Sequence, residues 1–333
     1  MFLGIEFGGT KLQLGVGYGK KAEFEALLRR DVNPNDGAQG ILNQIRECGT
    51  KLSQQFDLEH VGIGFGGPID GVSGRVTTSH QIDGWTDFPF VDWVYEQLQL
   101  PAVLGNDCDC AALAEAKFGA GKEHHAVYYI TVGTGVGGGL VVDGQVHGTD
   151  RPAAAEIGHL RPGLLALDSH ATVESVSSGW GISATARACL KDDAERIQDR
   201  ILPNGRPHLS GTDQKELLSR CRQNPDALTT MMIGQSAADG NAGARAIIRT
   251  STDVLGWGIA QVMAIVDPNI VVVGGGVSLM GEELFYGPLR ESVKQYLFPP
   301  IGDSWQVVAP ALDEEVVVHG AVALAAGRDC MLR

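Results

Sequence analysis

Hydrophobic residues recur along the first third of the chain with two different periods. Apolar or alternating runs bounded by glycine predict strands, whereas apolar residues three and four positions apart predict helices. The expected order is three strands and then alternating helices and strands, with strands at residues 2–7, 12–16, 22–32, 61–65 and 102–104 and helices at residues 38–56, 91–98 and 107–118.

The same opening, a strand followed by a Gly-Thr turn and another strand, returns after residue 125. It consists of a strand at residues 126–132, a glycine-rich turn at 133–139 and a hairpin around Asp143-Gly144. The polar residues 191–212 contain two prolines and two glycines, which predicts an irregular surface segment. The remaining pattern predicts strands at residues 270–273 and 305–308 and helices near residues 180–190, 213–221, 225–239, 241–265, 282–297 and 315–327.

This repeat of topology predicts an α/β protein with two lobes. The first lobe would span residues 1–117 together with the returning helix 315–333, and the second would span residues 118–314. The length of 333 residues also exceeds what one ordinary core needs. Two such lobes with a central cleft make the actin-like, ribonuclease H-like fold, which is the fold class that we expect.

The formal net charge of −14 bears on the possible partners. Nucleic acids are bound through basic surfaces, so this charge argues against a nucleic-acid partner. It does not exclude ATP, because backbone N–H groups and a metal ion hold phosphates inside acidic proteins. No apolar run of about 18 residues predicts a membrane span, and no signal peptide is recognisable.

The six cysteines are scattered along the chain, which is typical of reduced thiols in the cytoplasm. The segment Cys108-Asp109-Cys110 has half of a metal-site spacing. No second Cys or His pair with zinc-like spacing lies near it, so these thiols are expected to be structural.

Two glycine turns, at residues 8–11 and 274–276, each follow an expected strand. The first joins two strands and is not a Walker loop, which would lead into a helix. Its N–H groups and its lysine suit a phosphate, although a tight hairpin would have the same sequence. The second follows an apolar strand and would let a flat adenine or ribose lie on the backbone, with a strand-to-helix turn as the alternative. The residues are Gly8, Gly9, Thr10 and Lys11 in the first turn and Gly274, Gly275 and Gly276 in the second.

A third turn matches Gly-x-Gly-x-x-Gly at Gly133, Gly135 and Gly138. A dinucleotide-binding fingerprint requires a helix directly after such a turn, and here the following residues predict a strand. We therefore expect Gly133, Thr134 and Gly135 to form a second phosphate-binding hairpin.

Asp107 follows a strand, opens a helix and comes directly after Asn106. It is either the N-cap of that helix or a group at the carboxyl end of a strand, where α/β enzymes place catalytic residues. Phosphoryl transfer to an alcohol needs a carboxylate that accepts the hydroxyl proton, which makes Asp107 the candidate base.

Glu156 and His159 place an acid and an imidazole three residues apart, whereas Glu174 is unremarkable by itself. Carboxylates and imidazoles commonly bind sugars, because each can meet two adjacent hydroxyls. By residue type alone, Glu156 and His159 are equally compatible with a surface pair or with a core histidine.

These motifs, in this order, resemble the ROK family (repressor, open reading frame, kinase), whose enzymes are mostly bacterial sugar kinases. The resemblance covers nearly the whole chain. It rests on residues 4–11, 62–70, 106–107, 131–139, 156–159 and 273–276.

The resemblance implies an ATP-dependent sugar kinase that uses Mg²⁺. Asp107 would be the base, and Asn106 would bind the sugar together with Glu156, His159 and Glu174. The turns at residues 8–11 and 133–135 would hold the phosphates, the one at 274–276 would hold adenosine, and Glu6 would hold the metal through water.

Glucose, converted to glucose 6-phosphate, is the first candidate substrate that the resemblance implies. Fructose and N-acetylhexosamines are the alternatives, because hydroxyl geometry is not visible in a sequence. The family also implies a cytoplasmic enzyme that forms a homodimer.

The sequence departs from the family pattern at three places. Glu6 stands where many members have aspartate, and His80-Gln81 stands where many have Pro-Asn. Residues 160–173 lack the cysteines of the zinc knuckle found in many members. Zinc needs about four ligands, so we expect no structural zinc and a His159 that is available for the sugar.

Two other functions remain to be weighed. A family repressor would carry a DNA-binding helix-turn-helix before the kinase-like part, and the phosphate turn at Gly8 leaves no room for it. A catalytically silent sugar-binding protein is the second, which the altered loop and the missing knuckle allow. Asp107 and the intact glycine turns argue against it.

Overall fold

The computed structural model describes residues 1–78, 82–151, 153–164, 166–191 and 196–331, with the backbone alone at 328–331. The chain divides into two compact units. Unit 1 consists of Met1–Tyr129, Gly139–Ala155 and Pro310–Arg333, and unit 2 of Ile130–Gly138 and Glu156–Ala309. The lobes expected at residues 1–117 and 118–314 are a different division of the chain and stay a prediction.

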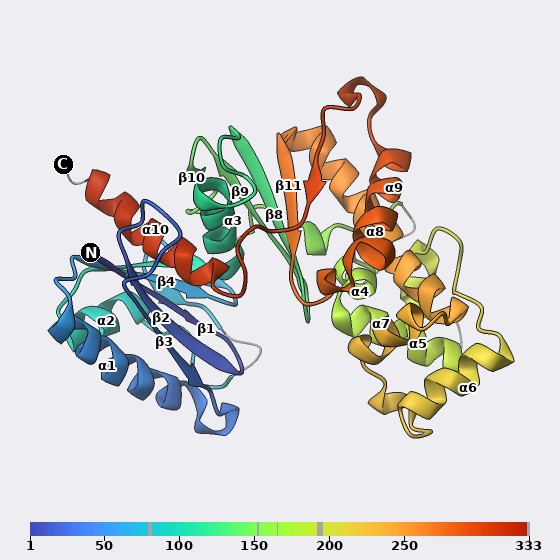
Figure 1. The fold of residues 1–333 in the computed structure, drawn as a ribbon, viewed down its shortest axis with the longest axis horizontal. Coiled ribbons are helices and arrows are strands. Elements are labelled where there is room, and N and C mark those ends of the chain that lie inside the picture. The colour runs from blue at the N-terminus through green and yellow to red at the C-terminus, as the bar shows by residue number, and fades with distance from the viewer. Residues whose placement is uncertain (79–81, 152, 165, 192–195, 332–333) are drawn as a thin grey trace. The chain divides into compact units, whose positions relative to one another are not determined.

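The main sheet of unit 1 has five strands, covered by four longer helices. The strands are β1 (Phe2–Phe7), β2 (Lys11–Gly17), β3 (Ala26–Asp31), β4 (His60–Phe65) and β7 (Ala102–Asn106), and the helices are α1 (Gly37–Gln55), α2 (Phe90–Leu98), α3 (Asp107–Phe118) and α10 (Val316–Met331). Their order in the sheet is β3-β2-β1-β4-β7 (Figure 1). β1 pairs antiparallel with β2 and parallel with β4, and β4 pairs parallel with β7. The small strands β5 (Ile69–Asp70) and β6 (Arg75–Val76) follow β4.

The two faces of this sheet differ in residue size. Large apolar residues such as Ile5 and Ile63 belong to the core that includes residues of α1 and α2. The glycines that alternate with them face α10, and a β-carbon built on Gly62 would lie 1.8 Å from the carbonyl oxygen of Ala321. Because successive side chains of a strand point to opposite faces, this alternation lets α10 lie directly on the sheet.

The second sheet has the order β10-β9-β8-β11-β12. Its strands are β8 (Ala126–Val132), β9 (Val136–Val142), β10 (Gln145–Val146), β11 (Ile270–Gly274) and β12 (Val307–Val308). A strand and not a helix follows the turn after β8, so the dinucleotide fingerprint is excluded. The expected turn at residues 133–139 was too long, because β9 already begins at Val136. Gly139 lies in that strand where α3 passes closely, since its β-carbon would be 2.6 Å from the carbonyl oxygen of Cys108.

The rest of unit 2 is mostly helical. Its helices are α4 (Glu174–Ser177), α5 (Gly179–Lys191), α6 (Gly211–Arg220), α7 (Thr230–Ala238), α8 (Ala242–Val266) and α9 (Gly287–Tyr296). Single turns occur in the two units at Pro34–Asp36, Ile157–His159, Ile197–Ile201, Pro225–Ala227, Ser278–Met280, Glu282–Tyr286 and Pro299–Ile301. The helix expected at 225–239 was wrong in its first part, because Thr229 caps a new helix by accepting a hydrogen bond from the N–H of Met232. The strands expected at 22–32 and 305–308 are shorter than predicted.

The expectation of a surface segment at residues 191–212 was wrong for part of its length. Ile201, Leu202 and Leu209 are all buried. The carboxylate of Asp199 pairs with both Arg196 and Arg206, which anchors the segment to itself. A sequence with few apolar residues thus folds as a small buried cluster; residues 192–195 lie outside the described part.

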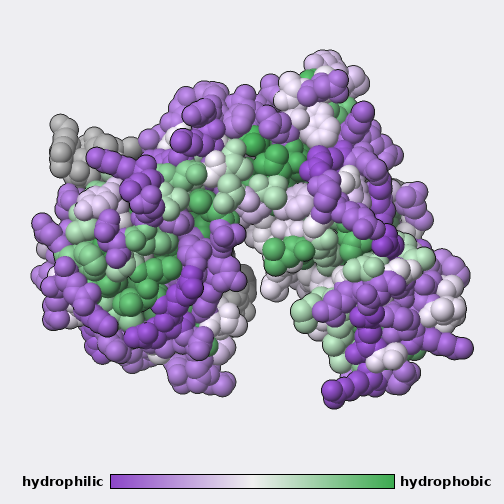
Figure 2. Space-filling view, viewed as in Figure 1, coloured by the Kyte–Doolittle hydropathy of each residue, from purple (hydrophilic) through white to green (hydrophobic). Residues whose placement is uncertain are grey.

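The described residues include no helix that is long and apolar enough to cross a membrane. Figure 2 agrees with this finding, because hydrophilic residues cover most of the visible face of each unit and hydrophobic ones form only patches.

Candidate functional site

Asp107 is the first residue of α3 and follows the carboxyl end of β7. Its neighbour Asn106 is the N-cap, since the Asn106 side chain accepts a hydrogen bond from the N–H of Cys108 at 2.8 Å. The idea that Asp107 is merely the N-cap is therefore wrong. One oxygen of Asp107 shares that N–H at 2.8 Å, and the other faces Gly66, whose built β-carbon would lie 3.1 Å from it.

The environment of Asp107 favours a proton-accepting carboxylate. Burial raises the pKa of its carboxyl above the ordinary value, and the hydrogen bond from Cys108 partly opposes that rise. Asp107 also acts on Glu6 in β1. The pKa of Glu6 is raised to about 7: burial raises it most, Lys11 lowers it, Asp107 raises it, and the hydrogen bond from Gln13 lowers it. Unit 1 therefore brings Glu6, Lys11 and Asp107 within electrostatic reach of one another.

Gln13 is a site residue that sequence reasoning missed. It is 1% exposed, and its amide nitrogen donates to a carboxylate oxygen of Glu6 at 3.0 Å. The same nitrogen lies 3.3 Å from the carbonyl oxygen of Glu314, and its amide oxygen accepts from Arg29. Gln13 thus holds the Glu6 carboxylate in place. A polar residue between Leu12 and Leu14, in a strand that is otherwise apolar after Lys11, was the signal that could have revealed it.

The turn at residues 8–11 closes on itself. The N–H of Gly8 donates to the carbonyl oxygen of Lys11 at 3.0 Å, so Gly8 shapes the turn rather than offering a donor to a ligand. Thr10 is exposed at the tip. The Lys11 ammonium lies 3.3 Å from the carbonyl oxygen of Glu314, at the exposed rim of the same turn.

The second glycine turn is built in the same way, inside unit 2. The N–H of Gly133 donates to the carbonyl oxygen of Gly135 at 2.9 Å. The carbonyl oxygen of Gly133 accepts from the N–H of Gly179 at 2.8 Å, which joins the turn to the first residue of α5. Thr134 is exposed, and nothing lies within 4 Å of a β-carbon built on Gly133. The turn therefore has open space at Gly133, which suits a phosphate, whereas a β-carbon built on Gly135 would lie 2.5 Å from the Glu174 carboxylate.

The three glycines after β11 do different things. Gly274 is buried at the end of the strand. Gly275 has a φ of +91°, and a β-carbon there would lie 2.6 Å from the carbonyl oxygen of Val132, so it packs against β8. Nothing lies within 4 Å of a β-carbon built on Gly276. Gly276 therefore presents an open backbone surface.

Unit 2 also brings the segments of the expected sugar ligands up to the turn at residues 133–135 and the strand that follows it. The carboxylate of Glu174 accepts a hydrogen bond from the N–H of Val136 at 2.8 Å. The turn Ile157–His159 meets the same residue, because a β-carbon on Gly158 would lie 2.1 Å from the carbonyl oxygen of Val136. Val136 thus links the segment of Glu156 and His159 to the helix that begins with Glu174.

Asn106 and Asp107 lie in unit 1, and the other expected sugar ligands lie in unit 2. The expected altered loop, His80-Gln81, lies outside the described residues. Within the described part of the chain, no group of three or more His, Cys, Asp or Glu side chains is arranged to hold a metal ion. His159 is exposed, and His170 lies 2.9 Å from the Asp168 carboxylate.

Glu174 offers a direct test of the link between sugar and phosphate. We expect Glu174→Gln to weaken nucleotide binding about 3- to 10-fold even without sugar, because an amide accepts the Val136 N–H less strongly than a carboxylate does. Titration with a fluorescent ATP analogue measures this affinity. Glu283→Gln is the matched control, because the Glu283 carboxylate of the same unit pairs with Arg245. Equal nucleotide affinity in wild type and Glu174→Gln would contradict the link.

The raised pKa of Asp107 predicts a shifted pH profile. A base works when deprotonated, so kcat/KM for the sugar should rise with pH as Asp107 loses its proton. Because burial raises this pKa, the acid limb should lie above about pH 4, where an ordinary aspartate titrates. Steady-state rates between about pH 4 and 9, with thermal unfolding followed in the same buffers, measure it. A flat profile down to the lowest pH at which the protein stays folded would contradict it.

Comparison with known proteins places this chain among relatives over nearly its whole length. The model of the ROK family matches residues 2–328. The glucokinase of Thermotoga maritima is 29% identical over 323 residues, which cover 97% of this chain and 96% of that protein. The N-acetyl-D-glucosamine kinase of Shigella flexneri is 28% identical over 280 residues, 84% of each chain.

Solved structures agree. The crystal structure of a ROK family glucokinase from Streptomyces griseus, in complex with glucose and AMPPNP, is 30% identical and has a TM-score of 0.76. It covers 98% of this chain, which covers 99% of it. This likeness confirms the expected α/β fold of the actin-like type. The chain therefore belongs to the ROK family.

Proposed function

We propose that this protein is an ATP-dependent sugar kinase that phosphorylates a hexose hydroxyl, with glucose as the first candidate and glucose 6-phosphate as its product. The observation that carries the proposal is the geometry of Asp107. Its carboxylate lies at a strand end, its neighbour Asn106 supplies the helix cap, and one of its oxygens faces Gly66. The glucokinases of Thermotoga maritima and Streptomyces griseus support the assignment.

In the proposed reaction Asp107 accepts the proton of the sugar hydroxyl. The hydroxyl oxygen then forms a bond to the γ-phosphorus of ATP, and the bond from that phosphorus to the β,γ-bridging oxygen breaks, so that ADP leaves. Glu174 would bind a sugar hydroxyl together with Glu156 and His159. Since its carboxylate also holds the Val136 N–H, Glu174 would position the sugar and the phosphate turn together.

The residues present fit a magnesium–nucleotide complex. Nothing lies within 4 Å of a β-carbon built on Gly8 or on Gly133, and the hydrogen bond from Gln13 orients the Glu6 carboxylate. We propose that Glu6 holds Mg²⁺ through water and that the turns at Gly8–Lys11 and Gly133–Gly135 hold the phosphates, with Gly276 against adenosine. When bound, Mg²⁺ would neutralise phosphate charge. The pKa of Glu6, raised to about 7 by burial, means that a cation there would also stabilise its ionised form.

A coupled assay that follows ADP release over a panel of sugars tests the function. We expect the highest kcat/KM with glucose, and the panel includes fructose, mannose, N-acetylmannosamine and N-acetylglucosamine. The N-acetyl-D-glucosamine kinase of Shigella flexneri makes an N-acetylhexosamine the strongest alternative substrate. If none of these sugars were phosphorylated although one of them bound tightly, the protein would be better described as a catalytically silent sugar-binding protein. The expected homodimer and the cytoplasmic location stay predictions.

We also expect the purified protein to carry no stoichiometric zinc. Residues 160–173 contain no cysteine, and a zinc site needs about four ligands. Elemental analysis of the dialysed protein measures the metal content, and chelator should leave the melting temperature unchanged. One zinc ion per chain, lost in a His159→Gln variant, would overturn this expectation.

A further inference from the structure

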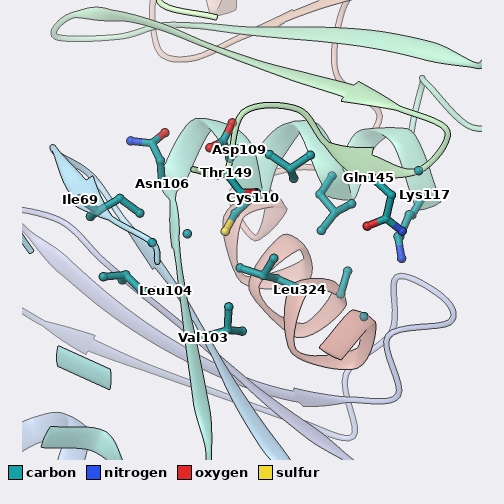
Figure 3. A pocket seen from close by; sticks show the side chains of 17 residues that line it. Ile69, Val103, Leu104, Asn106, Asp109, Cys110, Lys117, Gln145, Thr149 and Leu324 are labelled. Atoms are coloured by element: carbon teal, nitrogen blue, oxygen red, sulfur yellow. The ribbon is translucent and has the colours of Figure 1, made fainter. Parts of the chain in front are cut away.

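A cavity of about 410 Å³ lies inside unit 1, beside the helix that begins with Asp107 (Figure 3). Its walls come from β7, α3, α10 and the segment that follows β9. Every lining residue belongs to unit 1. Cavities of roughly 300–1,000 Å³ with mostly apolar walls and a few polar groups are the usual form of small-molecule sites.

The cavity is separate from the catalytic corner. α3 contributes Asp109, Cys110, Leu113 and Lys117, which form one face of the helix. At about 100° per residue, this face is roughly a quarter of a turn away from Asp107. Asn106 is the only proposed site residue among those that line the cavity. An occupant would thus touch the elements that place the catalytic base without entering its site.

Two main-chain groups in the apolar wall make no hydrogen bond to any residue that the structure describes. Val61 of β4 donates its N–H to the carbonyl oxygen of Pro101, and Ile63 pairs with Leu104 in the parallel register. In such a ladder the N–H and C=O of Leu104 point away from β4, toward the free edge of the sheet. Within the described residues neither group has a hydrogen-bond partner, although Leu104 is only 3% exposed. Buried main-chain groups are nearly always hydrogen-bonded, so this edge suits a polar group of a ligand.

A positive charge lies at one end of the cavity. Figure 3 shows Lys117 beside Gln145 there, while Val103 and Leu324 lie along the apolar walls. Lys117 is half-buried, and no hydrogen bond or ion pair to its ammonium occurs among the described residues. Lys117 thus supplies a cation at this end of the cavity, which favours an anionic group on whatever binds beside it.

We propose that this cavity is a binding site for a small carboxylic acid with an apolar body. The body lies against Val103, Leu113 and Leu324, and the carboxylate pairs with Lys117. The proposal does not depend on the kinase assignment, because its test measures binding alone.

Calorimetric titration of the full chain with 4-phenylbutyrate tests the site. We expect saturable binding of one molecule per chain with a dissociation constant in the millimolar range or below. The uncharged 4-phenylbutyramide should bind about tenfold more weakly, because it cannot form the ion pair. For Lys117→Met, the dissociation constant of the acid should rise to that of the amide in wild type. The affinity of this variant for the amide should equal that of wild type. Lys122→Met, which removes a lysine outside the cavity, is the matched control and should bind like wild type.

A second variant checks the location. Leu324→Phe enlarges a half-buried residue of the wall, so it should abolish binding of both compounds. If this variant has a lowered melting temperature, Val146→Phe in β10 fills the cavity from the other side of the wall and replaces it. No saturable binding up to about 10 mM would overturn the proposal. Binding that survives in the folded plug variants and in Lys117→Met would also overturn it, because the compound would then bind elsewhere.

Discussion

Replacement of Asp107 by asparagine is expected to lower kcat by about 100- to 10,000-fold, with sugar affinity largely retained. An asparagine keeps the size of the side chain and its contact with the Cys108 N–H, but it cannot accept the hydroxyl proton. The helix should stay intact because its N-cap is Asn106 and not Asp107. Stopped-time assays give kcat, and calorimetry with the preferred sugar gives the affinity.

Asp109→Asn is the matched control for that change. It removes the same charge from the same first turn of α3, on the face that lines the cavity. Its kcat should stay within about threefold of wild type, because surface-type changes away from the reacting atoms cost little. Near wild-type kcat in Asp107→Asn, or an equal loss in both variants, would reject Asp107 as the base.

Gly320→Ala is expected to lower the free energy of unfolding by about 3 kcal/mol. A β-carbon at this position would lie 1.8 Å from the carbonyl oxygen of Cys110 in α3. This neighbour is backbone and cannot rotate aside, so α10 would have to move away from α3. Since α3 carries Asp107, we also expect a lower kcat in the fraction that stays folded. Urea unfolding followed by circular dichroism measures the stability.

Gly327→Ala provides the comparison within the same helix. Nothing lies within 4 Å of a β-carbon built there, so only the helix propensity changes. The variant should be as stable as wild type or up to about 1 kcal/mol more stable. If both glycine variants lost stability equally, the close approach of α10 to α3 would not be the cause.

The strand–turn–strand openings and the long helices were predictable from short windows of sequence. β1 and β2 are joined by a tight turn, and α8 carries an uninterrupted apolar face, so local period and turn chemistry decide both. The position of Asp107 at the end of β7 was predictable for the same reason. The sequence could not show that Asn106 and not Asp107 is the N-cap, because this depends on which side chain reaches the Cys108 N–H.

Other features depended on segments that are distant in the sequence. The glycine run after β8 predicts a turn, yet Gly139 lies in β9. It is a glycine because α3 leaves no room for a side chain there. The burial of Ile201 and Leu209 in a polar segment was equally invisible. For Gly139 the deciding neighbour is α3, and for Leu209 it is α8, where a β-carbon built on Gly243 would lie 2.3 Å from the leucine side chain; both lie outside the window that a periodicity argument uses.

The sequence by itself determined the order of the elements, the glycine turns and the residue types of the candidate site, because backbone sterics and periodic burial act over a few neighbouring residues. The tertiary structure alone decided the partners. Gln13 reaches Glu6 across two paired strands, and Glu174 reaches the N–H of Val136 from 38 residues away. A hydrogen bond needs its donor and acceptor about 3 Å apart, so the bond between Glu174 and Val136 forms only after packing has brought these distant segments together.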